Sequence, residues 1–144
     1  MALSLDKIKS ALENYLPSNS RSQLIEKNSN KIILDAYNAN PTSMKAAIEN
    51  FAKMDGTDKV LLLGGMMELG QESLHEHQQL IELIKKYSWK NVVLVGGDFS
   101  KVDHPFINFD NSVQAMEWYR QQNYSNTSIL IKGSRSTQME KVLE

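Results

Sequence analysis

Short apolar runs alternate along this chain with segments in which apolar residues recur every three or four positions. The runs at 32–34, 60–63, 91–95 and 128–131 have the pattern of strands buried on both faces. Between them, helical spacing is clearest in one stripe: Met44, Ala47, Ile48 and Phe51. Strands alternating with amphipathic helices are typical of βαβ units. The pattern therefore predicts an α/β domain with a mostly parallel sheet.

Weaker signals predict the remaining elements. A helix from Ser4 ends at Pro17, and short strands at 22–26 and 106–109 complete the sheet, the first of them in a hairpin with the strand at 32–34. A final helix is expected from the spacing of Met139, Val142 and Leu143.

Capping residues predict where the other helices begin. Asn40 followed by Pro41 is a strong start signal for the helix that carries Met44. Ser73, with Glu76 three residues later, has the spacing of a capping box. Asp110 or Ser112 is expected to cap the next helix.

Four polar or glycine-rich loops follow the predicted parallel strands, at 35–40, 64–70, 96–100 and 132–136. Parallel crossovers are right-handed almost without exception, so these loops gather at one edge of the sheet. Ligands of open α/β sheets bind outside the carboxyl ends of strands, beside helix N-termini. We therefore expect the functional site at this edge.

Composition narrows the classes of function. The 144 residues suit one domain, and a formal net charge of −1 gives no electrostatic reason to expect nucleic acid or an anionic membrane as a partner. Without cysteine, disulfides and thiolate sites are excluded. Apolar runs fall far short of the roughly 20 residues of a membrane span, and the N-terminus lacks a signal-like pattern. We expect a cytoplasmic monomer.

Polar residues in the first loop are candidates for ligand binding. Asp35, at the end of a strand, suits ribose hydroxyls, but a cap or turn acceptor explains it equally well. Asn38 and Asn40 offer amide donors and acceptors, although asparagine is also common in turns, and Asn40 fits a cap first.

The segment from Lys132 to Ser136 is a candidate anion site. It combines Lys132, Ser134, Arg135 and Ser136 with the start of the predicted final helix. Backbone N–H groups, the helix dipole and a guanidinium all favour a carboxylate or phosphate. The alternative is a helix start whose charges are solvated, and the concentration of donors favours the anion site.

Two other kinds of site are disfavoured. His75 and His77 lie two positions apart on a predicted helix, on nearly opposite sides, and cannot share one metal ion. Neither G-x-x-x-x-G-K-[ST] nor G-x-G-x-x-G occurs in the chain. We therefore expect no metal site and no nucleotide phosphate cradle within these 144 residues.

Three separated motifs carry a resemblance to a known family. They are D-A-Y-N-A-N-P-T-S-M at 35–44, L-G-G-M-M-E-L-G at 63–70 with His77 seven residues later, and L-I-K-G-S-R-S at 130–136, extended by Met139 and Glu140. The sequence resembles the C-terminal domain of the Mur ligases over essentially its whole length. Within that family it is most similar to the enzymes that add D-alanyl-D-alanine to UDP-N-acetylmuramoyl-tripeptide in peptidoglycan synthesis.

The resemblance implies a Rossmann-like domain of three layers, with about six strands, in an ATP-dependent ligase. In such an enzyme ATP and Mg²⁺ activate the peptide carboxylate as an acyl phosphate, which the incoming amine attacks. The resemblance implies nucleotide binding by Asp35, Tyr37, Asn38 and Asn40. It also implies that Lys132, Ser134, Arg135 and Ser136 hold the dipeptide carboxylate and the developing charge. Lesser candidates are Glu68, His77 and Arg21; Glu68 either contacts ligand or orients its loop.

The sequence departs from the family pattern in three respects, the first being that Ser20 and Ser22 replace the more usual neighbours of Arg21. Gly65 stands where the family usually has an aspartate, and the UDP-sugar-binding and central ATPase domains are missing from the chain. Residues 1–22 are expected to form a helix and linker, and residues 23–144 the C-terminal domain itself. We expect this chain alone to be catalytically inactive and to bind no cofactor tightly. A standalone non-catalytic α/β binding or interaction module is the alternative.

Overall fold

The computed structural model describes residues 23–27, 29–35, 39–54, 58–67 and 69–143, apart from the Ser136 side chain. The helix expected from Ser4 lies outside these residues. The strands and α-helices are β1 (Gln23–Lys27), β2 (Asn30–Asp35), α2 (Pro41–Lys53), β3 (Lys59–Gly64), α3 (Ser73–Ile84), β4 (Asn91–Val95), β5 (Ile107–Phe109), α4 (Ser112–Gln122) and β6 (Ser128–Lys132). Short 3-10 helices are η1 (Gly70–Glu72), η2 (Phe99–Lys101), η3 (Arg135–Thr137) and η4 (Met139–Leu143).

The six strands form one sheet in the order β1-β2-β6-β3-β4-β5. β1 pairs antiparallel with β2, and every other pair is parallel. The predicted hairpin and the mostly parallel sheet are therefore confirmed. Because parallel strands point the same way, β2, β6, β3 and β4 all end at one edge.

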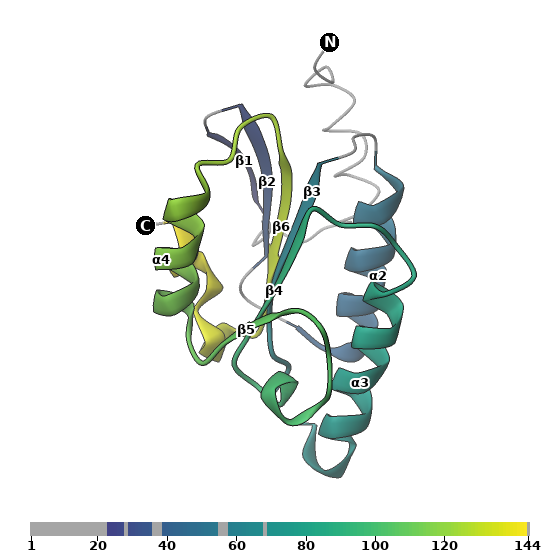
Figure 1. Cartoon of the computed structure of the whole chain (residues 1–144). Helices are drawn as coiled ribbons and strands as arrows, with labels where there is room; N and C mark the ends of the chain where they lie inside the picture. The colour runs from purple at the N-terminus through teal and green to yellow at the C-terminus, as the bar shows by residue number, and fades with distance from the viewer. Residues whose placement is uncertain (1–22, 28, 36–38, 55–57, 68, 144) are drawn as a thin grey trace.

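Helices cover both faces of the sheet. α2 and α3 lie on one side, and α4 with the yellow C-terminal segment lies on the other (Figure 1). Alternate residues of a strand point to opposite faces. Leu61 and Leu63 of β3 accordingly join the core beneath α2 and α3, whereas Val60 and Leu62 join the core beneath α4. Burial on both faces explains why the central strands are continuous apolar runs.

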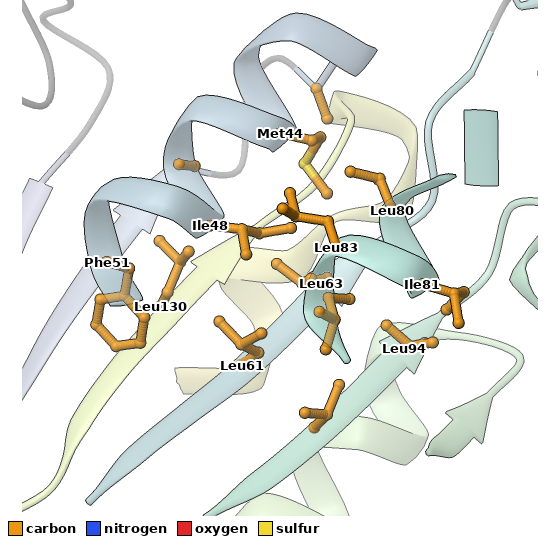
Figure 2. Packing of buried hydrophobic residues seen from close by; sticks show 14 of the residues in the cluster. Met44, Ile48, Phe51, Leu61, Leu63, Leu80, Ile81, Leu83, Leu94 and Leu130 are labelled. Carbon is orange, nitrogen blue, oxygen red and sulfur yellow. The ribbon is translucent and has the colours of Figure 1, made fainter. Parts of the chain in front are cut away.

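The helix α2 begins as its sequence predicts. The Asn40 side chain accepts a hydrogen bond from the Ser43 N–H at 2.8 Å, and Pro41 occupies the first turn. The predicted stripe is buried, and Figure 2 shows Met44, Ile48 and Phe51 pointing toward the strands and α3. Local capping and apolar spacing act together here, so the prediction is confirmed.

The other two predicted caps are wrong. α3 has Glu72 as its N-cap after the turn of η1, because the Ser73 hydroxyl donates instead to Asp98 Oδ2. α4 is capped by Asn111, whose Oδ1 accepts from the Gln114 N–H at 3.0 Å. Asp110 thus precedes the cap, and Ser112 is the first helical residue.

The predicted final α-helix is also wrong. The chain after β6 forms η3 and η4, separated by Gln138 in the left-handed region with φ 51°. Met139 and Val142 are nevertheless buried against the sheet, as their spacing predicts. A 3-10 helix places residues i and i+3 on one side, so the apolar spacing is satisfied without α-helical hydrogen bonding.

Within the described ranges, no helix is both long and apolar enough to cross a membrane.

Candidate functional site

Strand register brings the candidate loops together at the carboxyl edge of the sheet. Asp35 at the end of β2 is in register with Lys132 at the end of β6. On the other side of β6, Leu63 is in register with Lys132, and Gly64 is in register with Val95 of β4. The four loops expected to form a site therefore start within a few strand spacings of one another.

Asp35 and Lys132 form a buried ion pair. Lys132 Nζ lies 2.6 Å from Asp35 Oδ2, and the two side chains are only 2% and 3% exposed. Asp35 Oδ1 is buried and has no hydrogen-bond partner among the described residues. The two residues were assigned to separate nucleotide and substrate sites, but the structure joins them in one contact. A ligand that binds either charge must compete with the other.

The segment after β6 is packed more closely than its sequence suggests. A Cβ added at Gly133 would lie 2.7 Å from Thr137 Oγ1 and 2.9 Å from the Gly64 Cα atom. Ser134 is 7% exposed, whereas Arg135 is exposed. Because η3 has only three residues, the segment lacks the helix N-terminus on which the predicted anion site partly depended. Arg135 remains as its exposed cation.

The segment after β2 is described only in part. Tyr37 and Asn38 lie outside the described residues. Asn40 is exposed and satisfies the α2 N-terminus, since its Oδ1 accepts from Ser43 and its own N–H donates to Ser43 Oγ at 3.1 Å. The capping role expected for Asn40 is confirmed, and nucleotide contact by any of these residues stays a prediction.

Two glycines let the loops after β3 and β4 touch. A Cβ at Gly65 would lie 2.4 Å from the Gly97 Cα atom, and one at Gly97 would lie 2.6 Å from the Gly65 Cα atom. Gly97 also has φ +58°, which favours glycine. The usual aspartate of the family therefore does not fit at position 65 beside this loop. Glu68 lies outside the described residues.

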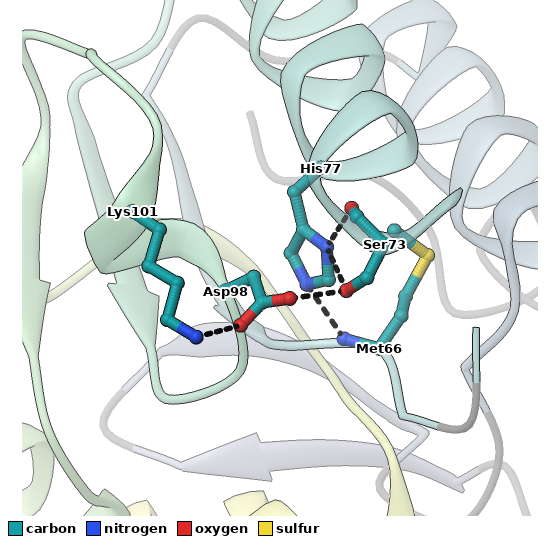
Figure 3. A network of polar contacts seen from close by, with 5 residues as sticks. All are labelled: Met66, Ser73, His77, Asp98 and Lys101. Carbon is teal, nitrogen blue, oxygen red and sulfur yellow. Dashed lines mark hydrogen bonds and ion pairs between the residues drawn. The ribbon is translucent and has the colours of Figure 1, made fainter. Parts of the chain in front are cut away.

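His77 of α3 packs against the same two loops (Figure 3). Its Nε2 accepts from the Met66 N–H at 3.1 Å, and its Nδ1 lies 2.7 Å from the Ser73 carbonyl oxygen. An acceptor at Nε2 and a donor at Nδ1 define the neutral ring. The ring is fully buried and meets Phe99 edge-on, with centroids 4.7 Å apart. This environment fits a positioning role and leaves no ring nitrogen for substrate.

Ser73 and Asp98 complete this network; the sequence predicts Ser73 only as a helix cap and gives no role to Asp98. Ser73 Oγ donates to Asp98 Oδ2 at 2.5 Å, and Lys101 Nζ lies 3.4 Å from Asp98 Oδ1. The Ser73 hydrogen bond, assisted by the charge of Lys101, lowers the pKa of the Asp98 carboxyl despite partial desolvation. The signal that could have found Asp98 is its place directly after the paired glycines.

The two histidines of α3 lie in different environments. His75 is exposed and His77 is buried, in keeping with their spacing on α3. Among the described residues no group of three or more His, Asp or Glu side chains could hold a metal ion. Arg21, the remaining candidate, lies outside the described residues.

Comparison with known proteins identifies the family. A sequence-family model described as "Mur ligase, glutamate ligase domain" matches residues 20–135. The UDP-N-acetylmuramoyl-tripeptide–D-alanyl-D-alanine ligase of Buchnera aphidicola subsp. Acyrthosiphon pisum is 33% identical over 100% of this chain and 33% of its own length. The Escherichia coli (strain K12) enzyme of the same name is 36% identical over 96% of this chain and 32% of its own length.

A solved structure agrees with the sequence comparisons. The MurF ligase from Thermotoga maritima in complex with ADP superposes with a TM-score of 0.73 at 25% identity, covering 85% of this chain and 29% of its own. This chain spans about a third of the length of the curated relatives. Fold, motifs and comparisons together show that the chain belongs to the Mur ligase family, as the C-terminal domain of that architecture.

Proposed function

We propose that this chain is the C-terminal domain of an ATP-dependent ligase that adds D-alanyl-D-alanine to UDP-N-acetylmuramoyl-tripeptide. One observation carries the proposal: relatives with that name match essentially the whole chain at 33% and 36% identity. The homologous structure that contains ADP supports ATP as the energy source. In line with this chemistry, the protein acts in the cytoplasm as a monomer.

ATP and Mg²⁺ would be held mainly outside this chain. The sequence has no phosphate loop, and the described residues include no group suited to a metal ion. ATP supplies the phosphoryl group that activates the peptide carboxylate, and a central ATPase domain would cradle its phosphates. The part proposed for this chain is to close over that domain and contribute contacts from the carboxyl edge of the sheet.

Two neighbouring parts of that edge would bind different ligands. Asp35, Tyr37, Asn38 and Asn40 would meet the ribose and adenine side of the nucleotide. Lys132, Ser134, Arg135 and Ser136 would contact the dipeptide and the charge that develops as its amine attacks. Arg135 is the exposed cation of this segment. The Asp35–Lys132 pair would brace both loops, because one ion pair joins the ends of β2 and β6.

The experiment is a ligation assay on the product of the complete natural reading frame that encodes this chain. We expect ATP-dependent joining of D-alanyl-D-alanine to UDP-N-acetylmuramoyl-tripeptide, with release of ADP and phosphate. A product that folds but neither hydrolyses ATP nor joins these substrates would contradict the proposal and favour a standalone binding module.

Replacing Arg135 tests the site within that assay. Arg135→Ala should raise KM for the dipeptide far more than KM for ATP, with a loss of about 2–4 kcal/mol in transition-state stabilisation. Arg135→Lys should recover little of this loss, because lysine lacks the planar guanidinium fork. An exposed side chain contributes little to the core, so the melting temperature should stay unchanged. Unaltered dipeptide kinetics in Arg135→Ala would remove Arg135 from the site.

A further inference from the structure

The oxidisable sulfur of this chain belongs to methionine. The sequence contains seven methionines and no cysteine. Peroxides convert the methionine thioether to a sulfoxide, and methionine sulfoxide reductases reverse that step. Because no thiol competes for the oxidant, peroxide reacts with the methionines, and the exposure of each sulfur determines which one reacts first.

One methionine differs from the others in exposure. Met67 is 47% exposed, and no other methionine among the described residues is exposed. Two methionines are half-buried, and three are at most 2% exposed; the first group is Met54 and Met116, and the second is Met44, Met66 and Met139. Met67 is therefore the sulfur that an oxidant in solution meets first.

The backbone that precedes Met67 is held in place. The Gly65 N–H donates to the Val95 carbonyl at 2.8 Å, and the Met66 N–H donates to His77 Nε2 at 3.1 Å (Figure 3). The Met66 side chain already fills its place in the core beneath α2 and α3. Because adjacent side chains cannot share that place, Met67 stays outside the core, and its sulfur stays accessible at the carboxyl edge.

Met67 shares a cavity with a lysine. The cavity has a volume of about 290 Å³, and Met67, Val113 and Lys141 all line it. Lys141 is half-buried and forms no ion pair within the described ranges, not even with Asp110, the one carboxylate of the lining. A thioether sulfur is only a weak hydrogen-bond acceptor, so the reduced Met67 offers little to this ammonium.

We propose that Met67 is a reversible oxidation site. Hydrogen peroxide transfers one oxygen atom to the Met67 sulfur: a sulfur lone pair forms the S–O bond as the O–O bond breaks. The leaving hydroxide takes up the remaining proton of the peroxide, so the products are the sulfoxide and water. The sulfur loses two electrons, and the peroxide gains them. A methionine sulfoxide reductase, with a thiol as the electron donor, returns the thioether.

Oxidation changes the contacts within the cavity. The sulfoxide oxygen is a polar acceptor, and it accepts a hydrogen bond from the Lys141 ammonium that lines the same cavity. This bond ties the loop after β3 to the chain after β6. Neither step depends on the proposed function, although both take place at the edge where its ligands would bind.

The first test follows the methionine methyl signals of the ¹³C- and ¹⁵N-labelled 144-residue chain by NMR during treatment with dilute hydrogen peroxide. We expect Met67 to react at least about tenfold faster than Met66, its buried neighbour in the sequence. In urea the two should react at equal rates, because the fold alone distinguishes them. Methionine sulfoxide reductases for both sulfoxide epimers should restore the Met67 signal, and their thiol reductant meets no cysteine in this chain.

The second test examines the contact with Lys141. Oxidation should shift the amide signals of Thr137 and Gln138, which line the cavity on the β6 side. Met67→Leu should abolish these shifts, whereas Met116→Leu, at a half-buried methionine, should leave them unchanged. Lys141→Ala should also abolish them without slowing oxidation, and Lys53→Ala, on the exposed last turn of α2, is its matched control.

Three results would overturn the inference. Equal oxidation rates of Met66 and Met67 in the folded chain would remove the selectivity. A sulfoxide that the reductases leave in place would remove the reversibility. Amide signals of Thr137 and Gln138 that stay unmoved, or that move equally in Lys141→Ala, would exclude the contact with Lys141. The ligation assay judges the proposed function separately.

Discussion

At the scale of single residues, the ion pair between Asp35 and Lys132 is the most consequential contact. Desolvating two charges is costly, and their attraction offsets that cost only when the geometry is close, as the 2.6 Å separation is here. The pair also ties together two residues 97 positions apart in the sequence. It therefore fixes the ends of two strands at the candidate site.

Breaking this pair should destabilise the domain. Lys132→Met leaves the Asp35 carboxylate buried without its counter-charge, and we expect a loss of about 3–5 kcal/mol in the free energy of unfolding. The double variant Asp35→Leu with Lys132→Met should recover most of this loss, because both charges are then removed. Urea unfolding of the single and double variants measures both effects.

An exposed pair serves as the control. Lys90 Nζ lies 3.8 Å from Asp58 Oδ2, and the two side chains are 44% and 53% exposed. Lys90→Met should change stability by no more than about 0.5 kcal/mol, because water screens exposed charges. If Lys132→Met has an equally small effect, the buried pair contributes no specific stability.

Position 65 gives a second prediction at this scale. Gly65→Asp should destabilise the domain by about 2–3 kcal/mol, since its Cβ would overlap the Gly97 backbone, which cannot rotate away. Gly70→Ala is a useful comparison because its Cβ would meet nothing within 4 Å. Only the left-handed backbone, with φ +59°, should lower the free energy of unfolding, by about 1 kcal/mol. Thermal unfolding of both variants shows which substitution lowers the stability of the domain more. An aspartate tolerated at position 65 would show that the two loops separate easily.

At the scale of elements, one hydrogen bond joins α3 to η2. Ser73 begins α3, and its hydroxyl donates to Asp98, which directly precedes η2. This contact explains why Ser73 does not act as a cap: its hydroxyl is already used by a residue 25 positions away. The bond holds the loop after β4 against the helix that follows β3.

This bond predicts a pH dependence. The pKa of the Asp98 carboxyl is lowered in the folded state from its ordinary value of 3.8, chiefly by the Ser73 hydrogen bond. A carboxyl with a lowered folded pKa stabilises the fold above its unfolded pKa, and that contribution is lost as the pH falls through the folded pKa. Ser73→Ala should raise the Asp98 pKa and lower the stability near pH 7, with a difference from wild type that shrinks below pH 3.8.

Two measurements check the expected rise of the Asp98 pKa and the expected pH dependence of stability. NMR titration of the Asp98 carboxyl gives its pKa directly, and urea unfolding at neutral and acidic pH gives the stability difference. A Ser73→Ala variant with the wild-type Asp98 pKa would assign the shift to Lys101 instead. A stability difference that grows toward acidic pH would contradict the sign of the linkage.

At the scale of the whole molecule, apolar packing covers both faces of the sheet, and the candidate site lies at one edge. Both faces are covered by apolar clusters, and Ala39, Met66 and Phe99 extend one of these clusters into the loops at the carboxyl edge. The buried pair Asp35 and Lys132 lies where β2 and β6 end. Under the proposed function, this edge would face the partner domain and the substrates.

The absence of a phosphate loop from the sequence gives the prediction at this scale. The 144-residue chain alone should hydrolyse no ATP and form no peptide product, with or without Mg²⁺. Its affinity for ATP should be weak, because each missing charge-assisted hydrogen bond to phosphate forfeits about 1.5–3 kcal/mol. Isothermal calorimetry and a phosphate-release assay test this. Micromolar ATP binding would reveal a nucleotide site within this chain.

The sequence by itself determined the features that depend on local pattern. The apolar runs of β2, β3, β4 and β6 predicted a sheet buried on both faces. Asn40 with Pro41 predicted the start of α2, because a cap acts on backbone groups only three residues away. The three separated motifs identified the family, which the comparisons confirm.

Only the tertiary structure decided the features that depend on distant partners. The order of the strands brings Asp35 to Lys132, and no local pattern encodes that register. Ser73 was a plausible cap until Asp98 was placed beside it, and the chain after β6 packs as 3-10 turns against the sheet. The physical reason is the same in these cases: a polar or apolar group interacts with the partner that the fold places nearest to it. Local propensity, worth about 1 kcal/mol or less per residue, yields to that contact.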